Sequence, residues 1–524
     1  MSTFLVHPEL AHSMTLTEKV GQFFQPAAFI NDSEAEIQKL ENLIREHHIG
    51  SICFFHSRAS AATNFEGKKQ IVHNEESLET LHKLIARYQK AAKYPLLISI
   101  DAEWGLAMRI ENTLQLPYAV TLGALADNDL IRETGKRIGE HCLASGIHWN
   151  LAPVVDVNSN PNNPVIGYRS FGNDPKTVTE KAAAFLQGTK DTGVLNSLKH
   201  FPGHGDTATD SHLGLPVIAK TKTQLLREEL YPFAELIKTG VDSVMIGHLS
   251  VPALDPTGTP ATLSKPIIKD VLQDELEFNG VVISDALNMH AVSKDFEEPG
   301  SLELAAFEAG NDILCFAEHV EAGISRILAS VTQEEIEHRF QKVWELKCKA
   351  QVIQKEHQPL DTYDSKAFNT QLAEKSLTEL RSASALLPEK TSGSFTVVTV
   401  GKPKENVFVN GLARELQFDQ LKLAELPESF DKPVLIALFP PKAKPADYYG
   451  LGETTWNHLH ELIATGNGIL YLFGNPYLLE KLPHEQLAGL TIVYQDFPEF
   501  QEIAANHFLG KHKAVGQFPL TLSS

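Results

Sequence analysis

The chain alternates between short unbroken runs of apolar residues and longer segments in which apolar residues recur every three or four positions. An unbroken run predicts a strand that is buried on both faces, and the wider spacing predicts an amphipathic helix. The segment from Ser77 to Ala92 shows the helical spacing, with Leu81, Leu84 and Tyr88 on one face. The runs that predict strands lie at 23–30, 49–55, 95–100, 147–157, 194–198, 242–247, 280–284 and 312–316.

A predicted helix follows each of these strands, so the first part of the chain reads as repeated β/α units. Repetition on this scale predicts a (β/α)8 barrel over residues 1–350. The alternative is an open doubly wound sheet, which has the same alternation of strands and helices.

A second and smaller domain is predicted after Pro359. Residues 351–390 read as a helical linker that includes a helix from Lys366 to Ser384. Beyond it, residues 391–524 predict an α/β three-layer sandwich. None of its predicted strands ends in a group of His, Asp or Glu, so no chemistry is assigned to it. Its predicted strands lie at 395–400, 434–439, 468–473 and 490–494.

The composition restricts the partners and the compartment. A formal net charge of −20 argues against nucleic acid and anionic membrane surfaces as partners. No apolar stretch has the length of a membrane span, and residues 1–13 lack the pattern of a secretory leader. Four widely spaced cysteines form no CxxC pair and are expected to be reduced, which favours a cytoplasmic protein. An exported protein without its leader would fit the same residues. The oligomeric state stays open, with a monomer favoured.

Polar residues that can do chemistry follow the predicted strands directly. In a barrel the carboxyl ends of all strands meet at one mouth, where active sites lie. This convergence is the main sequence argument for an enzyme. The residues concerned are Asp101, Asp156, His200, His248 and Asp285.

Asp285 leaves a buried strand into a turn of small residues. A carboxylate in such a place is costly unless it is paired or used. We therefore predict that Asp285 is a nucleophile that attacks an electrophilic carbon. The alternative is a cap for the helix that follows.

A polar loop at residues 199–212 carries a candidate acid–base pair. An Asp that accepts a hydrogen bond from one imidazole nitrogen leaves the other nitrogen to transfer a proton. We predict this role for Asp210 and His212. Gly203 and Gly205 predict that this half of the loop is mobile and closes on the substrate. A surface turn with chance histidines is one alternative, and the other is a metal site built from His200, His204, His212 and His248.

Further polar side chains near the predicted mouth suit a polyhydroxylated ligand. Trp104 could stack on a sugar face or simply pack. The alternative is a structural network of ion pairs at the strand ends. The predicted ligand-binding residues are Asp101, Arg109, Arg169, Lys199 and His248.

Several motifs together resemble family 3 glycoside hydrolases, specifically the β-N-acetylglucosaminidase branch. The most specific is Lys199-His200-Phe201-Pro202-Gly203-His204-Gly205, followed by Asp210-Ser211-His212. Many relatives have glycine where this chain has Trp104, and the stretch at 56–73 is longer than needed. Supporting matches lie at 16–22, 101–103, 151–157, 169–172, 260–264, 284–287 and 309–312.

The resemblance implies a retaining double displacement on terminal β-linked N-acetylglucosamine, as in fragments of peptidoglycan. Asp285 would match the nucleophile, and His212 with Asp210 would match the unusual acid–base pair of this branch. No metal or organic cofactor is implied. A phosphorylase or a broader β-glycosidase on the same fold, and an inactive sugar-binding protein, stay open as alternatives. The positions that would match the binding site for the sugar are Asp101, Arg109, Arg169, Lys199 and His200.

Overall fold

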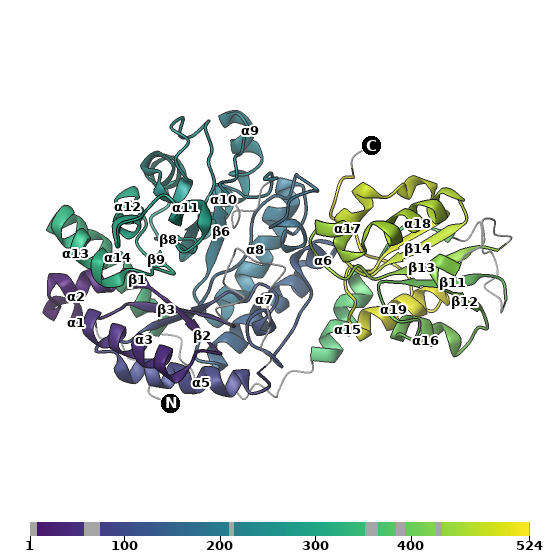
Figure 1. Cartoon of the computed structure of the whole chain (residues 1–524), viewed down its shortest axis with the longest axis horizontal. Helices are drawn as coiled ribbons and strands as arrows, with labels where there is room; N and C mark the ends of the chain where they lie inside the picture. The colour runs from purple at the N-terminus through teal and green to yellow at the C-terminus, as the bar shows by residue number, and fades with distance from the viewer. Residues whose placement is uncertain are drawn as a thin grey trace. The chain divides into compact units, whose positions relative to one another are not determined.

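The computed structural model describes residues 8–56, 74–208, 214–351, 365–383, 393–425 and 432–522. Contacts between residues divide the chain into two compact units (Figure 1). The first contains residues 1–115, 132–157 and 182–363, and the second contains residues 116–131, 158–181 and 364–524. Two segments from the barrel half of the sequence therefore group with the C-terminal residues. The contiguous boundaries expected from the sequence stay a prediction.

The first unit is a closed barrel of parallel strands. β2 to β5 form one sheet, β6 to β8 form another, and β1 pairs with β9. Single bridges at Trp149–Leu195 and Ile283–Ile313 connect these sheets, and β1 continues into β2. The predicted (β/α)8 barrel is confirmed, and closure excludes the open sheet. The strands are β1 (Phe24–Gln25), β2 (Ala27–Phe29), β3 (Ser51–Phe55), β4 (Leu97–Ile100), β5 (Trp149–Asn150), β6 (Ser197–Phe201), β7 (Ser243–Ile246), β8 (Val281–Ser284) and β9 (Leu314–Cys315).

Two predicted strands are shorter or broken in the structure. The run at 23–30 is interrupted at Pro26, which has no N–H to donate to a neighbouring strand. Only Trp149–Asn150 is regular within the run at 147–157, which contains Pro153. In both places an apolar run predicted burial correctly and overestimated the length of the regular ladder.

The strand that leads into the polar loop lies three residues later than the sequence predicts. β6 runs from Ser197 to Phe201 instead of ending at Leu198. Lys199 and His200 are therefore strand residues, and both are buried. Their polar side chains hid the continuation of the strand from a pattern based on apolar runs.

Helices surround the barrel, and α2, α3 and α9 begin at capping boxes. Thr15 accepts a hydrogen bond from the N–H of Glu18, and the Glu18 carboxylate accepts one from the N–H of Thr15. None of the described helices is long and apolar enough to cross a membrane. The helices are α1 (Leu10–Ser13), α2 (Leu16–Gly21), α3 (Glu34–His47), α5 (Ser77–Ala91), α7 (Asn128–Ala144), α8 (Pro175–Thr192), α9 (Lys222–Arg227), α10 (Tyr231–Ile237), the π-helix η4 (Pro266–Glu275), α11 (His290–Ser293), α12 (Ser301–Ala309), α13 (Val320–Ser330) and α14 (Gln333–Gln351).

The second unit is built on a six-stranded sheet with the order β10-β15-β14-β13-β11-β12. β12, β11, β13, β14 and β15 are parallel neighbours in that order, and β10 joins β15 antiparallel at one edge. The predicted α/β sandwich is confirmed. The strands are β10 (Thr378–Arg381), β11 (Thr396–Val400), β12 (Asp419–Leu421), β13 (Val434–Leu438), β14 (Gly468–Leu472) and β15 (Gly489–Ile492).

Helices cover both faces of this sheet. In Figure 1, α17 and α18 lie on one side, and α15, α16 and α19 lie on the other. The helix predicted at Lys366 to Ser384 is wrong in its second half, because the chain leaves α15 after Ser376 and forms β10. The short α6 comes from the barrel half of the sequence but belongs to this unit. The helices are α6 (Ala119–Gly123), α15 (Ser365–Ser376), α16 (Val407–Ala413), α17 (Ala446–Gly450), α18 (Glu453–Ala464) and α19 (Pro498–Phe508).

Candidate active site

The ammonium group of Lys199 lies between two carboxylates that follow β4. Its Nζ is 2.8 Å from Oδ1 of Asp101 and 2.7 Å from Oε1 of Glu103. The other carboxylate oxygen of Asp101 accepts a hydrogen bond of 2.9 Å from Nη2 of Arg109. The structure thus brings together three of the predicted ligand-binding residues and adds Glu103 to them.

These charges are held firmly in place. Burial raises the pKa of Asp101, but the Lys199 and Arg109 cations outweigh it and lower the value to about 2. The guanidinium of Arg109 also stacks over the ring of Phe55, 3.7 Å from its centroid. The ion pairs fit both interpretations made from the sequence, because the groups that pair with one another are also those that a polar ligand would contact.

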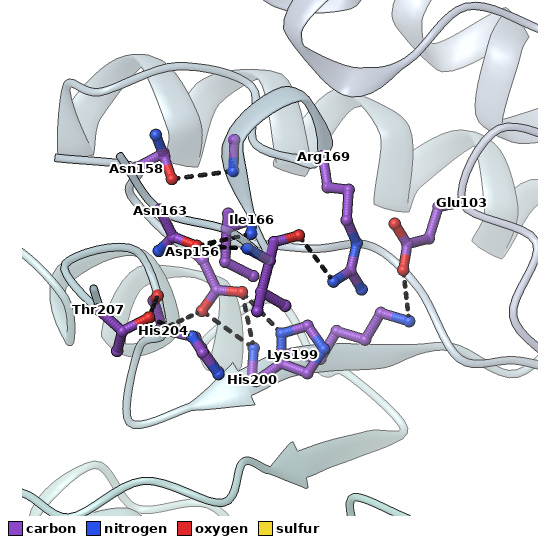
Figure 2. A network of polar contacts seen from close by, with 12 residues as sticks. Glu103, Asp156, Asn158, Asn163, Ile166, Arg169, Lys199, His200, His204 and Thr207 are labelled. Atoms are coloured by element: carbon purple, nitrogen blue, oxygen red, sulfur yellow. Dashed lines mark hydrogen bonds and ion pairs between the residues drawn. The ribbon is translucent and has the colours of Figure 1, made fainter. Parts of the chain in front are cut away.

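His200 is oriented by a fully buried carboxylate at Asp156. Its ring Nδ1 is 2.7 Å from Oδ2 of Asp156, and its backbone N–H donates to the same side chain (Figure 2). Because a carboxylate only accepts, Nδ1 carries the proton of this contact. Burial raises the pKa of Asp156, but the His200 ring outweighs it, and the net shift is downward. The Nδ1–H of His200 is therefore committed to Asp156.

A second histidine contacts the same carboxylate. The backbone N–H of His204 donates to Oδ1 of Asp156 at 2.7 Å, and its ring Nδ1 is 2.8 Å from Oγ1 of Thr207 (Figure 2). Burial lowers the pKa of His204 to about 4, and the neighbouring ring of His200 acts in the same direction. His204 is thus a neutral structural residue near pH 7, and it fixes the start of the loop that the sequence singled out.

Asp285 follows β8 directly, as predicted. Its backbone N–H donates to the carbonyl oxygen of Ile246 on β7, at 2.9 Å. Its Oδ1 accepts a hydrogen bond of 2.7 Å from the N–H of Ala286. The nearby helix α11 begins at His290 and Met289 is its N-cap, so Asp285 does not serve as the cap that the sequence left open.

His248 lies at the end of β7 and is fully buried. Its Nδ1 is 2.7 Å from Oγ1 of Thr262, and its Nε2 is 2.9 Å from the carbonyl oxygen of Ala286. Both ring nitrogens thus contact protein groups. The expectation that His248 binds a ligand directly stays a prediction.

Arg169 belongs to the second compact unit. It closes the short 3-10 helix at Gly167–Arg169, and its Nη1 donates to the carbonyl oxygen of Val165 at 3.4 Å (Figure 2). The side chain of Asn163 accepts from the N–H groups of Val165 and Ile166, which shapes the preceding turn. The contact of Arg169 with a ligand stays a prediction.

The predicted acid–base pair, Asp210 and His212, lies outside the described residues. The prediction that this half of the loop is mobile concerns the same residues. The residues on either side are described. Lys220 is 3.3 Å from Oδ2 of Asp206 and also pairs with the buried Glu229. An ion pair between Lys220 and Asp206 therefore joins described residues that precede and follow the predicted pair in the sequence.

The sequence did not reveal the contacts that three further side chains make in this site. Glu103 stands two residues after Asp101, so its proximity to the mouth was a usable signal. Asp156 was noticed at a strand end, but nothing in one sequence pairs it with His200. Thr262 lies in the motif match at 260–264, but nothing in one sequence pairs it with His248. Among the described residues, no group of three His, Cys, Asp or Glu side chains is placed to hold a metal ion.

The closed barrel presents carboxylates, a buried lysine and an oriented histidine at its strand ends. These features define a (β/α)8 enzyme that acts on polar ligands. The sequence model of the "Glycosyl hydrolase family 3 N terminal domain" matches residues 15–346. The chain therefore belongs to glycosyl hydrolase family 3, and it is a glycoside hydrolase.

Two relatives and one solved structure illustrate the similarity. "Beta-hexosaminidase A" of Pseudoalteromonas piscicida is 37% identical over 52% of this chain, a match that covers 47% of that protein. "Beta-hexosaminidase" of Hydrogenovibrio crunogenus is 33% identical over 50% of this chain and 74% of its own. A family 3 β-N-acetylglucosaminidase from Paenibacillus sp. str. FPU-7 superposes with a TM-score of 0.79 at 29% identity, covering 97% of this chain and 99% of that one.

Proposed function

We propose that this protein is a retaining, exo-acting β-N-acetylglucosaminidase. The observation that carries the proposal is the carboxylate of Asp285, which a backbone N–H contacts at the end of β8 within a family 3 barrel. The names of its relatives, β-hexosaminidase and β-N-acetylglucosaminidase, support the choice of sugar.

The sugar unit at the reacting end contacts the charged groups around Lys199. Asp101 accepts hydrogen bonds from sugar hydroxyls because it is ionised, and Arg109 and Lys199 donate to sugar oxygens. His200 adds a contact through Nε2, since its Nδ1 is committed to Asp156. These groups are already held by one another, so binding costs little side-chain ordering. Arg169 is proposed for the same sugar on the resemblance alone.

The reaction proceeds in two displacements. In the first, a carboxylate oxygen of Asp285 bonds to the anomeric carbon while the bond to the leaving oxygen breaks. His212 donates a proton to that oxygen, and Asp210 stabilises the ring. In the second, His212 takes a proton from water, the hydroxide oxygen bonds to the anomeric carbon, and the carboxylate of Asp285 is released.

The proposed substrates are peptidoglycan fragments that end in β-linked N-acetylglucosamine. The proposed place of their degradation is the cytoplasm. The polyhydroxylated ligand expected from the sequence agrees with this choice. Free N-acetylglucosamine is the product of hydrolysis, so its release in phosphate-free buffer is the expected result. Formation of a sugar 1-phosphate instead, only when phosphate is added, would assign a phosphorylase.

Replacement of the nucleophile tests the proposal. Asp285→Asn should lower kcat on an aryl β-N-acetylglucosaminide by at least about 10⁴-fold, because no covalent intermediate can form. The matched control is Asp295→Asn, an exposed carboxylate further along the same connection, which should keep full activity. An Asp285→Asn protein that is folded and retains more than a few per cent of the wild-type rate would reject Asp285 as the nucleophile.

A further inference from the structure

The imidazole of His248 bridges two elements that the sequence places far apart. Thr262 lies in the 3-10 helix Ala261–Leu263, and Ala286 comes directly after the proposed nucleophile. The ring is fully buried, with its two nitrogens 2.7 Å from the hydroxyl oxygen of Thr262 and 2.9 Å from the carbonyl oxygen of Ala286. A histidine that contacts protein at both nitrogens acts on its neighbours rather than on a ligand.

The chemistry of these partners determines the tautomer. A carbonyl oxygen can only accept, so Nε2 of His248 carries a proton and donates it to Ala286. Burial lowers the pKa of His248, which keeps the ring neutral near pH 7 and leaves Nδ1 as an acceptor. Thr262 then donates its hydroxyl proton to Nδ1, its shortest contact, rather than to the carbonyl oxygens of Ile246 or Gly247 at 3.2 and 3.1 Å.

The bridge ends on the peptide groups that hold Asp285. The N–H of Asp285 donates to the carbonyl oxygen of Ile246, and the carbonyl of Ala286 accepts from His248. Residues 285 and 286 are therefore fixed to the end of β7 at two points. The N–H of Ala286 in turn donates to Oδ1 of Asp285. Any rotation of the Ala286 backbone would move this donor and, with it, the carboxylate.

We propose that His248 and Thr262 are positioning residues for the nucleophile: Thr262 sets the tautomer of His248, and His248 holds Ala286 so that its N–H orients the carboxylate of Asp285. This inference rests on the proposed function, in which Asp285 attacks the sugar. It replaces direct sugar binding as the role of His248. Small misplacements of a reacting group can cost about 10²-fold in rate, so loss of this chain should be visible in kcat.

Paired substitutions at His248 test the contact to Ala286. The amide nitrogen of Gln reaches the place of Nε2, whereas that of Asn reaches only the place of Nδ1. His248→Asn should lower kcat about 10- to 100-fold on an aryl β-N-acetylglucosaminide, and His248→Gln should retain most of it. The inhibition constant of free N-acetylglucosamine should stay unchanged in both. Equal rates in the two variants, or a raised inhibition constant in both, would overturn the proposal in favour of a packing or sugar-binding role.

Substitutions at Thr262 test the other end and provide a second route if the His248 variants do not fold. Thr262→Val keeps the shape but loses the hydroxyl, and should lower kcat about tenfold with KM unchanged. Thr262→Ser should restore the rate. Full activity in a folded Thr262→Val protein would overturn the proposal.

The Asp285→Asn protein in the same assay separates the two claims. If it is inactive while the Thr262 and His248 variants are fully active, only the positioning role fails. If it is active, the proposed nucleophile fails as well.

Discussion

Lys199 is nearly inaccessible to solvent, and two carboxylates lie beside its charge. Asp101 and Glu103 both lie within 2.8 Å of its Nζ. Removal of one member of such a cluster leaves uncompensated charge in a buried place, which is far more costly than loss of a surface ion pair. The positive charge of Lys199 is therefore expected to stabilise the mouth of the barrel.

Lys199→Met should destabilise the protein by about 3–5 kcal/mol at pH 7. In the wild type the pKa of Asp101 is depressed to about 2, so its contribution to stability is complete at neutral pH and is lost as the pH falls toward that value. In the variant Asp101 keeps its contact with Arg109, but both carboxylates lose the Lys199 cation and gain from protonation. The difference in the free energy of unfolding between the two proteins should therefore shrink between pH 7 and pH 4.

Urea unfolding at both pH values measures this difference. Lys19→Met is the control, because Lys19 pairs with the partly exposed Glu337 and should cost no more than about 1 kcal/mol. A loss in Lys199→Met that is independent of pH would contradict the electrostatic explanation.

Lys347 is a second buried lysine, and within the described part of the chain its hydrogen bonds go to uncharged groups. Its Nζ donates to Oε1 of Gln22 and to the carbonyl oxygen of Pro95. Burial lowers its pKa to about 7. Between that value and 10.5, the unfolded chain holds a proton that the folded chain lacks, so this residue makes stability rise with pH.

Lys347→Met should remove that slope. The gain in the free energy of unfolding of the variant over wild type should be larger at pH 7 than at pH 9.5. Urea unfolding at the two pH values measures this gain. Lys83→Met, on the exposed face of α5, should show no such dependence. The same pH dependence in Lys347→Met as in wild type would contradict the lowered pKa.

At this scale the sequence located candidate side chains at the strand ends better than it predicted what they contact. Asp101, Lys199 and Asp285 were identifiable because a charged residue at the end of an apolar run has few structural explanations. The pairing of His200 with Asp156 was not predictable, because it joins residues 44 positions apart whose contact depends on the closure of the barrel.

At the level of elements, apolar runs located the strands, and polar or irregular residues hid their ends. Residues 222–237 form two helices, since α9 ends at Arg227 and α10 begins at Tyr231. β10 was predicted as helix because its residues Thr378 to Arg381 continue a helical pattern. Pairing with β15 overrides that local preference, and no single-sequence pattern contains the partner.

Gly401 is an element boundary where two constraints coincide. It follows β11 with a φ of +81°, and a Cβ at this position would lie 1.8 Å from the carbonyl oxygen of Phe439. Gly466 has a similar φ of +76° with no atom within 4 Å of such a Cβ. Comparison of substitutions at the two glycines therefore separates the cost of backbone strain from the cost of steric overlap.

Gly466→Ala should cost about 1–2 kcal/mol from the left-handed backbone alone. Gly401→Ala should cost clearly more, because the backbone of Phe439 must also move. Calorimetric unfolding of both variants measures the comparison. Equal losses would show that the loop at Phe439 yields without cost.

At the scale of the whole molecule, the sequence predicted two α/β architectures in the right order. It predicted contiguous domains joined by a linker at 351–390, which stays a prediction. Contacts group residues 116–131 and 158–181 with the second unit. Ala124 is a clear case, since it is fully buried in the same hydrophobic cluster as Val398, Ile436 and Leu470. Apolar patterns identify a buried residue but do not say which core buries it.

Ala124→Glu should therefore destabilise the second unit, although the residue lies in the barrel half of the sequence. A charge without a partner in that core is expected to cost several kcal/mol. Hydrogen exchange should accelerate in β13 and β14 before it changes in β3 and β4. Ala126→Glu, at an exposed position two residues away, is the control. Faster exchange confined to β3 and β4 would contradict the assignment.

The grouping of residues 116–131 and 158–181 with residues 364–524 also has a consequence for the order of events during synthesis. Translation proceeds at about 5–20 residues per second, so the early segments leave the ribosome roughly ten seconds or more before the sheet that they pack against. During that interval the apolar side chains of α6 have no core to enter. The nascent chain therefore has a period of vulnerability to aggregation and chaperone capture, and its length is set by the position of these segments along the gene.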